Sequence, residues 1–330
     1  MVDVLPDMQR LTSRKVMKFS LWAVAGIVAL LTLSVIALML TLSSEKLNLP
    51  AVDVGALPAA SPPPGMSISA LPTGTYDGPA AMMFNGGAWG DHRNLTMTAV
   101  LVRHPKGNLL IDMGAGRDID AHFKLLPLGQ QFSAYVKATP VVTQLAAAGL
   151  KTSDIAAIIP THAHWDHVSG IEDLPGVPVM ETREGKSYID GKPEGTEVIN
   201  SFRNLKYRFY RFDGGPYLGF PKSHDVFGDG SVVIVPAPGH TPDSVAVFVS
   251  LPSGKRYAFI GDLVFQGEGL QLPAEKPWIM RKMIGEKDEV VHRDIALFRA
   301  VQAEYPQFVI VPAHEARAFA AIPKFPAAAR

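Results

Sequence analysis

One uncharged apolar segment near the N-terminus constrains this chain more than any other feature. Residues 19–42 form 24 consecutive positions without a charged side chain. At about 1.5 Å per residue, a helix of this length covers about 36 Å, more than the roughly 30 Å of a bilayer's hydrocarbon core. We therefore predict a single transmembrane helix over 19–42.

The charges before this segment predict its orientation in a membrane. Because cytoplasmic flanks of membrane helices are rich in Lys and Arg, we expect residues 1–18 to be cytoplasmic and the rest of the chain to be periplasmic or extracellular. An alternative is a cleaved secretory signal, although such signals have apolar regions of only about 7–15 residues. Four basic side chains outnumber two acidic ones before the segment: Arg10, Arg14, Lys15 and Lys18 against Asp3 and Asp7.

The rest of the chain divides into a short linker and one domain. Residues 43–65 are rich in Pro, Ala, Gly and Ser, a composition typical of a semi-extended linker that holds a domain off the membrane. Residues 66–330 contain no second segment of this kind, so we expect one folded domain there.

Composition excludes several classes of function. The chain of 330 residues has 31 Lys and Arg against 31 Asp and Glu, which disfavours a nucleic-acid partner. It has no cysteine, which excludes disulfides, thiolate zinc sites, cysteine-ligated iron–sulfur clusters and thiol nucleophiles. Any metal ion must therefore be held by nitrogen and oxygen ligands.

Strand and helix patterns alternate through residues 66–330 and predict a layered α/β domain. A hairpin is predicted over 95–112, where an alternating strand turns at Pro105-Lys106-Gly107. Further strands are predicted at 155–159, 177–181, 207–212, 231–235, 244–249, 257–260 and 308–311, with helices at 139–148 and 287–304.

Metal-competent side chains gather directly after the apolar run 155–159. The segment THAHWDH, residues 161–167, places three histidines and an aspartate within six positions, and imidazole and carboxylate suit zinc or another divalent transition metal. Similar side chains follow three later predicted strands, where sites on layered α/β folds tend to lie. The candidates are His162, His164, Asp166 and His167, followed by His240, Asp262 and His314.

The ordered set THAHWDH, PGHT, GD and a late histidine resembles the metallo-β-lactamase superfamily in its binuclear hydrolase form. The resemblance implies an αββα sandwich over residues 66–330, with the site at the edge between two sheets. It implies that Asp112 supports the site from behind, although a plain turn aspartate is an alternative. The implied ligands are His162, His164 and His240 for one metal ion, Asp166, His167 and His314 for the second, and Asp262 as a bridge.

The implied chemistry is hydrolysis with two Zn²⁺ ions, or alternatively Mn²⁺ or Fe. Two divalent ions lower the pKa of a shared water toward 7 and polarise the scissile bond, so a hydroxide between them attacks without a serine or cysteine. Asp262 and Asp166 are then the catalytic residues, and Asp166 is a candidate proton donor to the leaving group.

Departures from relatives favour a small ester, lactone or amide substrate. True β-lactamases of the superfamily lack an aspartate at the position of Asp262, and its quorum-signal lactonases carry a tyrosine where this chain has Phe265. A phosphodiesterase and a di-iron redox enzyme are alternatives, and the sequence specifies no oligomeric state.

Aromatic side chains near the motifs are candidates for the substrate pocket. Trp165 lies within the ligand motif, and Phe265 follows Asp262. Tyr217 and Phe220, beside a Gly-Gly-Pro segment, are predicted to lie on a loop that covers the site, with ordinary strand core as the alternative. Together these residues favour a partly apolar small-molecule substrate.

Overall fold

The structure is a computed structural model that describes residues 6–40, 46–131 and 134–330. The chain divides into two units, Met1–Ser43 and Ser44–Arg330. Within the described residues, the first unit is one helix, α1 (Pro6–Leu40). Its segment Ser20–Met39 is long and apolar enough to cross a membrane, a test that signal sequences also pass. Residues 41 and 42 of the predicted span lie outside the described residues.

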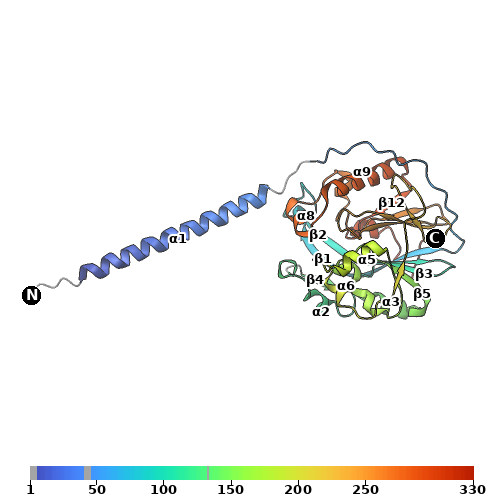
Figure 1. The fold of residues 1–330 in the computed structure, drawn as a ribbon, viewed down its shortest axis with the longest axis horizontal. Helices are drawn as coiled ribbons and strands as arrows, with labels where there is room; N and C mark the ends of the chain where they lie inside the picture. Colours follow the sequence, from blue (N-terminus) through green and yellow to red (C-terminus); the bar gives the residue numbers. More distant parts are fainter. Residues whose placement is uncertain (1–5, 41–45, 132–133) are drawn as a thin grey trace, which may run out of the picture. The chain divides into compact units, whose positions relative to one another are not determined.

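The second unit is a sandwich of two facing sheets with helices on both outer faces (Figure 1). The first sheet has seven strands in the order β4-β1-β2-β3-β5-β6-β7, and the second has five in the order β12-β11-β10-β9-β8. The predicted layered α/β sandwich is thereby confirmed.

The elements of the second unit have the following bounds. The first sheet contains β1 (Ser67–Pro79), β2 (His92–Arg103), β3 (Asn108–Ile111), β4 (Tyr135–Lys137), β5 (Ile155–Ile159), β6 (Val179–Glu181) and β7 (Tyr207–Phe209). The second contains β8 (His224–Asp225), β9 (Val232–Pro236), β10 (Val245–Ser250), β11 (Arg256–Phe259) and β12 (Phe308–Val311). The α-helices are α2 (Ile119–Phe123), α3 (Val141–Ala147), α4 (Trp165–Val168), α5 (Arg183–Asp190), α6 (Glu197–Ser201), α7 (Glu268–Gln271), α8 (Trp278–Ile284), α9 (Asp288–Glu304) and α10 (Ala316–Phe319).

Alternate side chains of the central strands are buried on opposite faces. In β2, Val102 packs between the two sheets, whereas Leu101 packs beneath α3, α5 and α6. In β9, Val232 packs between the sheets, whereas Val233 packs beneath α9. Because both of its faces are covered, β9 has the continuous apolar sequence from which it is predicted.

The strand directions bring the predicted ligands to one rim. β3 pairs in parallel with β5, so the residues that follow both strands lie at the same edge of the first sheet. β9 and β11 are both antiparallel to β10, and β12 is parallel to β11, so these three strands end at one edge of the second sheet. The carboxyl ends carry Asp112, His162–His167, His240, Asp262 and His314.

The predicted linker is the main correction to the domain organisation. Residues 46–65, here called the strap, have an extended course but pack on the outer face of the domain. Leu47 and Val54 contact the apolar cluster beneath α9, and the Leu47 amide donates to the Pro273 carbonyl at 2.8 Å. Near its end, the Ser61 amide donates to the Asp229 carbonyl at 2.7 Å. The described part of the predicted linker is thus part of the domain; its positions 43–45 lie outside the described residues.

The strand β1 is absent from the sequence prediction, although it is 13 residues long. Pro72 and Gly74 interrupt its pattern, and its pairing with β2 shifts register between them. Residues near the C-terminus also pair with it, since Ile68 bridges to Ala329 and Ala70 to Lys324. These distant partners, rather than its own sequence pattern, specify the strand.

Candidate metal centre

All seven predicted ligands come together in two adjoining clusters. Within each cluster, the candidate ligand atoms lie within 4.8 Å of one another. Every one of these side chains is buried except His164, which is half-buried. The first cluster contains His162, His164, His240 and Asp262, and the second contains Asp166, His167 and His314.

The Asp262 carboxylate lies between the two clusters. Its Oδ1 is 3.3 Å from His167 Nε2 and 3.1 Å from His314 Nε2, both in the second cluster. Its Oδ2 is 3.7 Å from His240 Nε2 and 3.9 Å from His162 Nε2, both in the first cluster. Its Oδ2 is also 3.1 Å from His314 Nε2, so the carboxylate as a whole lies between the clusters, as a bridging ligand requires.

The chemistry of these side chains fits a pair of divalent metal ions. Among the residues that the structure describes, buried atoms without a hydrogen-bond partner include His162 Nε2, His167 Nε2 and Asp262 Oδ1. An unpaired buried polar atom costs about 1–3 kcal/mol, so three such atoms in one small volume indicate a site for a cation. Burial and the neighbouring histidines lower the pKa values of His162 and His164 well below their usual range, which keeps both rings neutral as metal ligands require.

The local sequence explains how one short motif supplies four ligands. After β5 the backbone bends at Thr161 and His162 and is extended at His164, which lies immediately before the single helical turn α4. That turn carries Asp166 and His167 in its first residues. The approach of the neighbouring strand end requires Gly261, because a Cβ there would lie 3.0 Å from the Thr161 side chain. Gly261 also has a φ of +52°, which favours glycine.

Asp112 supports His167 from behind. His167 Nδ1 lies 3.0 Å from Asp112 Oδ2, so its other nitrogen points toward Asp262. The Thr161 amide donates to Asp112 Oδ1 at 2.6 Å and the Thr161 hydroxyl to Oδ2 at 3.0 Å. Burial opposes protonation of His167, but the carboxylates of Asp112, Asp262 and Asp166 raise its pKa well above the usual range. A bound cation would replace that proton.

A buried Lys276–Glu286 pair supports the first cluster and is missing from the sequence prediction. His240 Nδ1 lies 2.6 Å from Glu286 Oε1, and Lys276 Nζ donates to the same oxygen at 2.5 Å. Lys276 Nζ also donates to the backbone carbonyl of Asp262 at 2.6 Å. Burial opposes ionisation of Glu286, but Lys276 and His240 lower its pKa. In the sequence, these are two ordinary charged residues on either side of α8, and no motif marks them.

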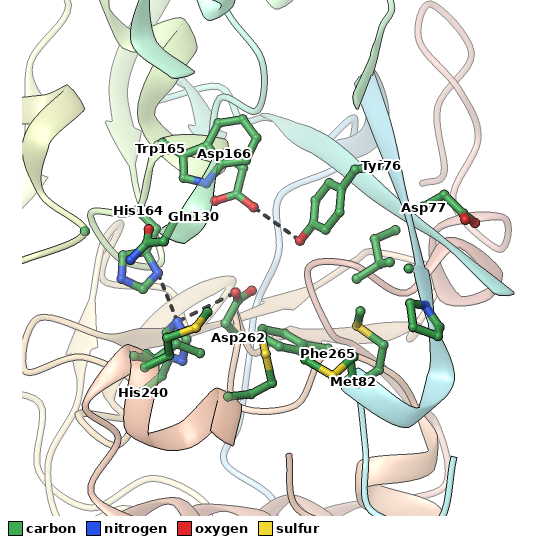
Figure 2. Close-up of a pocket in the computed structure, with 18 of the residues that line it drawn as sticks. Tyr76, Asp77, Met82, Gln130, His164, Trp165, Asp166, His240, Asp262 and Phe265 are labelled. Atoms are coloured by element: carbon green, nitrogen blue, oxygen red, sulfur yellow. Dashed lines mark hydrogen bonds and ion pairs between the residues drawn. The ribbon is translucent and has the colours of Figure 1, made fainter. Parts of the chain in front are cut away.

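A pocket of about 300 Å³ opens beside the two clusters. Figure 2 shows its polar end, where His164, His240, Asp166 and Asp262 lie close together. Two predicted pocket residues, Trp165 and Phe265, line it. The remaining wall is mainly apolar and includes Pro79, Met82, Met83, Leu95, Met280, Met283 and Ile284.

Tyr217 and Phe220 do not line this pocket, which corrects their predicted role. Both are buried in the cluster beneath α9, where Tyr217 lies 5.1 Å from the Phe248 ring and Phe220 lies 5.3 Å from the Phe298 ring. Leu218 and Gly219 adopt positive φ values in a tight turn between them. This turn folds both aromatic rings onto the outer face of the second sheet, away from the ligand clusters.

Tyr76 is a pocket residue that the sequence analysis missed. Its hydroxyl donates to Asp166 Oδ2 at 3.4 Å, and its ring meets the His314 ring edge-on at 5.4 Å (Figure 2 shows the contact with Asp166). Desolvation and the carboxylates of Asp166 and Asp262 raise its pKa well above the usual value, so the hydroxyl stays a donor near neutral pH. The missed strand β1 carries this residue, which explains why sequence pattern gave no sign of it.

The sequence and fold have recognisable relatives. The sequence profile of the metallo-beta-lactamase superfamily matches residues 96–300. A probable metallo-hydrolase of Mycobacterium tuberculosis is 28% identical over 201 residues, which cover 55% of this chain and 62% of the relative. The N-acyl homoserine lactonase AttM of Azorhizobium caulinodans is 27% identical over 164 residues, or 46% of this chain and 59% of AttM. The chain thus spans about three fifths of the length of these curated relatives.

The solved structures show the same fold at low sequence identity. An N-acyl homoserine lactone hydrolase with N-hexanoyl-L-homoserine bound at its catalytic metal centre superposes with a TM-score of 0.63. The superposition covers 82% of this chain and 100% of that one, at 17% identity. Because the profile matches well over half of the sequence, this chain belongs to the metallo-β-lactamase superfamily.

Proposed function

We propose that this protein is a membrane-anchored hydrolase that uses two divalent metal ions, zinc foremost, to cleave a small ester, lactone or amide. The observation that carries this proposal is the Asp262 carboxylate, which lies between two clusters of ligand atoms at the end of an apolar pocket. Such a pocket fits an acyl group better than a highly charged substrate.

The residues around the two clusters have distinct roles in this proposal. When bound, the two ions supply a water of lowered pKa and polarise the bond to be cleaved. Asp262 would bridge the two clusters. Asp112 orients His167, and Glu286 orients His240. Phe265 and the methionine side chains exclude bulk water from the acyl group.

Proton movement falls to Asp166 and Tyr76, which are in contact. In hydrolysis the acyl C–O bond breaks, the water oxygen stays on the acyl carbon, and the leaving oxygen takes a proton. Asp166 accepts that proton from the water and passes it to the leaving oxygen. Tyr76 donates a hydrogen bond to the substrate oxygen that becomes negatively charged. Tyr76, carried by β1, thereby replaces the tyrosine hydroxyl that is absent at position 265, where this chain has Phe265.

Similarity to relatives supports an ester bond, and lactones are the first substrates to test. AttM and the superposed hydrolase are both described as enzymes of N-acyl homoserine lactones. A lactone is an internal ester, so a metal centre that cleaves it also serves for open esters. The substrate of this chain is proposed from that shared chemistry.

The proposed location is a cell membrane, with the N-terminus in the cytoplasm and the hydrolase domain periplasmic or extracellular. The length and apolar character of α1 support it, together with the basic residues before the apolar segment. A periplasmic reporter fused after residue 46 should be active, and the chain should resist extraction by alkaline carbonate. A cytoplasmic reporter signal, or release by carbonate, would contradict the anchor.

One experiment tests the hydrolase proposal as a whole. The full chain, purified in detergent, is analysed for metal content and assayed against lactones, aryl esters, amides and phosphodiesters. We expect two zinc ions per chain and turnover of lactones or esters, with loss of both in Asp262→Ala. Preferential turnover of phosphodiesters would favour a phosphodiesterase, and two iron ions with visible absorption would favour a redox enzyme.

A further inference from the structure

The outer rim of the pocket on the α8 side carries exposed apolar side chains. Met280, Met283 and Ile284 of this short helix line the pocket. Met283 is 36% exposed, and Trp278 at the start of the helix is 46% exposed. Just before α8, Leu272 is 41% exposed. The same stretch also carries the exposed cationic side chain of Lys282.

Another exposed apolar side chain lies two residues from a residue that lines the pocket. Gln130 lines the pocket at the end of the short 3-10 helix Leu128–Gln130, and Leu128 is 87% exposed. Single exposed apolar side chains are ordinary on a protein surface, but a set of them near the mouth of an apolar pocket marks a binding surface. We call Leu128, Leu272, Trp278, Lys282 and Met283 the mouth surface.

The strap limits how far this surface can lie from a membrane that contains α1. The helix ends at Leu40, and the strap is first attached to the domain at Leu47, by the hydrogen bond to the Pro273 carbonyl. Six residues, 41–46, separate those two positions, so their alpha carbons can be at most about 25 Å apart. A domain of this size is about 50 Å across. The side of the domain that carries Pro273 must therefore lie next to the bilayer.

We propose that the mouth surface rests on the bilayer that holds α1, and that the pocket takes its substrate from the lipid phase. Pro273 directly follows Leu272 and precedes Trp278 by five residues, so the short connection and the apolar rim belong to one region. The side chains match an interface, since tryptophan favours the headgroup level and lysine favours anionic lipid. The substrate class is then an ester or lactone whose acyl chain partitions into the membrane. This inference rests on the proposed anchor and hydrolase activity.

The absence of cysteine from the chain makes the docking directly measurable. Single cysteines replace Leu128, Leu272 or, as control, Ser253, and carry an environment-sensitive fluorophore attached by an impermeant reagent. Ser253 is exposed in the turn between β10 and β11, which lies at the end of the second sheet opposite the ligands. Each full chain is reconstituted in vesicles of phosphatidylcholine and phosphatidylglycerol, with or without brominated acyl chains.

We expect brominated lipid to quench the labels at positions 128 and 272 about two-fold, and the label at position 253 little. Equal quenching at all three positions, or greater quenching at position 253, would overturn the docking. This measurement requires no turnover, so it stands even if the hydrolase assays fail. Release of the chain from the vesicles by alkaline carbonate would overturn the anchor and the docking together.

A second measurement tests the route of the substrate. Trp278 does not line the pocket, so Trp278→Asp should leave turnover of a water-soluble acetyl ester within about two-fold of wild type. Turnover of a long-chain lactone dissolved in vesicles should fall about ten-fold. The matched control is Phe209→Asp on the edge strand β7, where Phe209 is 42% exposed, and it should change neither rate. Equal losses in the two variants, or no loss in Trp278→Asp, would contradict the membrane route.

Discussion

At the scale of single residues, the support behind the ligands is as specific as the ligands themselves. Asp112 fixes His167, Glu286 fixes His240, and the backbone carbonyl of Thr96 lies 3.0 Å from His314 Nδ1. In each pair one ring nitrogen is held, which aims the other at the ligand clusters. Three separate segments of the chain supply these partners, so the geometry of the centre depends on the whole rim.

Tyr76→Phe tests the proposed hydrogen bond to the substrate. The variant keeps the ring against His314 but lacks the hydroxyl that lies 3.4 Å from Asp166. We expect kcat to fall by about 10- to 1000-fold with little change in KM, because the bond strengthens as charge develops. Metal content should stay as in wild type, and adding Phe265→Tyr should restore part of the rate. An unchanged kcat would remove Tyr76 from the mechanism.

Lys276→Met tests the buried ion pair. The substitution leaves the Glu286 carboxylate buried beside His240 without its cation, so we expect a loss of about 3–5 kcal/mol in the free energy of unfolding. The double variant Lys276→Met/Glu286→Gln should recover much of that loss, since no charge is then left unpaired. Urea denaturation of the four members of this cycle measures both effects. Additive losses would contradict a direct pair.

Glu181 predicts a pH dependence of stability. It is buried at the end of β6, and burial together with the Asp243 carboxyl raises its pKa from 4.5 to about 8. The unfolded chain loses this proton first, so the stability due to Glu181 is complete below pH 4.5 and is lost as the pH rises through about 8. We expect Glu181→Gln to exceed wild type by about 1–3 kcal/mol at pH 8 and by less at pH 5.

Urea denaturation at the two pH values, with the exposed Glu184→Gln as matched control, measures this effect. The control should show the same small difference from wild type at both pH values. A gain for Glu181→Gln that is equal at pH 5 and pH 8 would contradict the raised pKa.

At the scale of elements, the sequence pattern predicts a strand or helix well where both faces of the element are buried and its contacts are local. β5 (Ile155–Ile159) and β12 (Phe308–Val311) have the bounds predicted from their apolar runs, and α9 begins one residue after its predicted start. β1 and the strap could not be predicted in this way. Pro72 and Gly74 weaken any strand preference in β1, and the strap has no regular structure, so long-range contacts decide both.

Val54→Asp tests whether the strap is part of the fold. Val54 is buried among the residues beneath α9, so an unpaired charge there should lower the free energy of unfolding by about 2–4 kcal/mol. The exposed Ala51→Asp, three residues earlier, is the matched control and should have little effect. Thermal and urea unfolding measure both variants. If the two variants were equally stable, residues 46–65 would be a free linker and not part of the fold.

At the scale of the whole molecule, the metal centre joins the two sheets. Its ligands follow β5 in the first sheet and β9, β11 and β12 in the second. Removing bound metal should therefore weaken the domain as a unit, and we expect a chelator to lower the melting temperature by about 5–15 °C. Added Zn²⁺ should restore it, and Asp262→Ala should respond much less. A melting temperature that does not change when chelator is added would contradict metal binding.

At the same scale, some residues of the site could be predicted from the sequence and others could not. The seven ligands were identifiable because their types and order are unusual and follow predicted strand ends. Tyr76, Lys276 and Glu286 reach the site from a missed strand and from irregular segments, so only the folded chain brings them there. Tyr217 and Phe220 were misassigned because an aromatic ring in a glycine-rich turn suits a core as well as a lid.

The pairing of β1 with residues near the C-terminus has a consequence for the order of assembly. The Ala70 amide donates to the Pro323 carbonyl at 2.9 Å, and the Phe325 amide donates to the Ala70 carbonyl at 2.9 Å. During synthesis, β1 leaves the ribosome early, whereas these partners leave after His314, the last of the seven ligands. The strand that carries Tyr76 thus gains its last partners only after every ligand has been made.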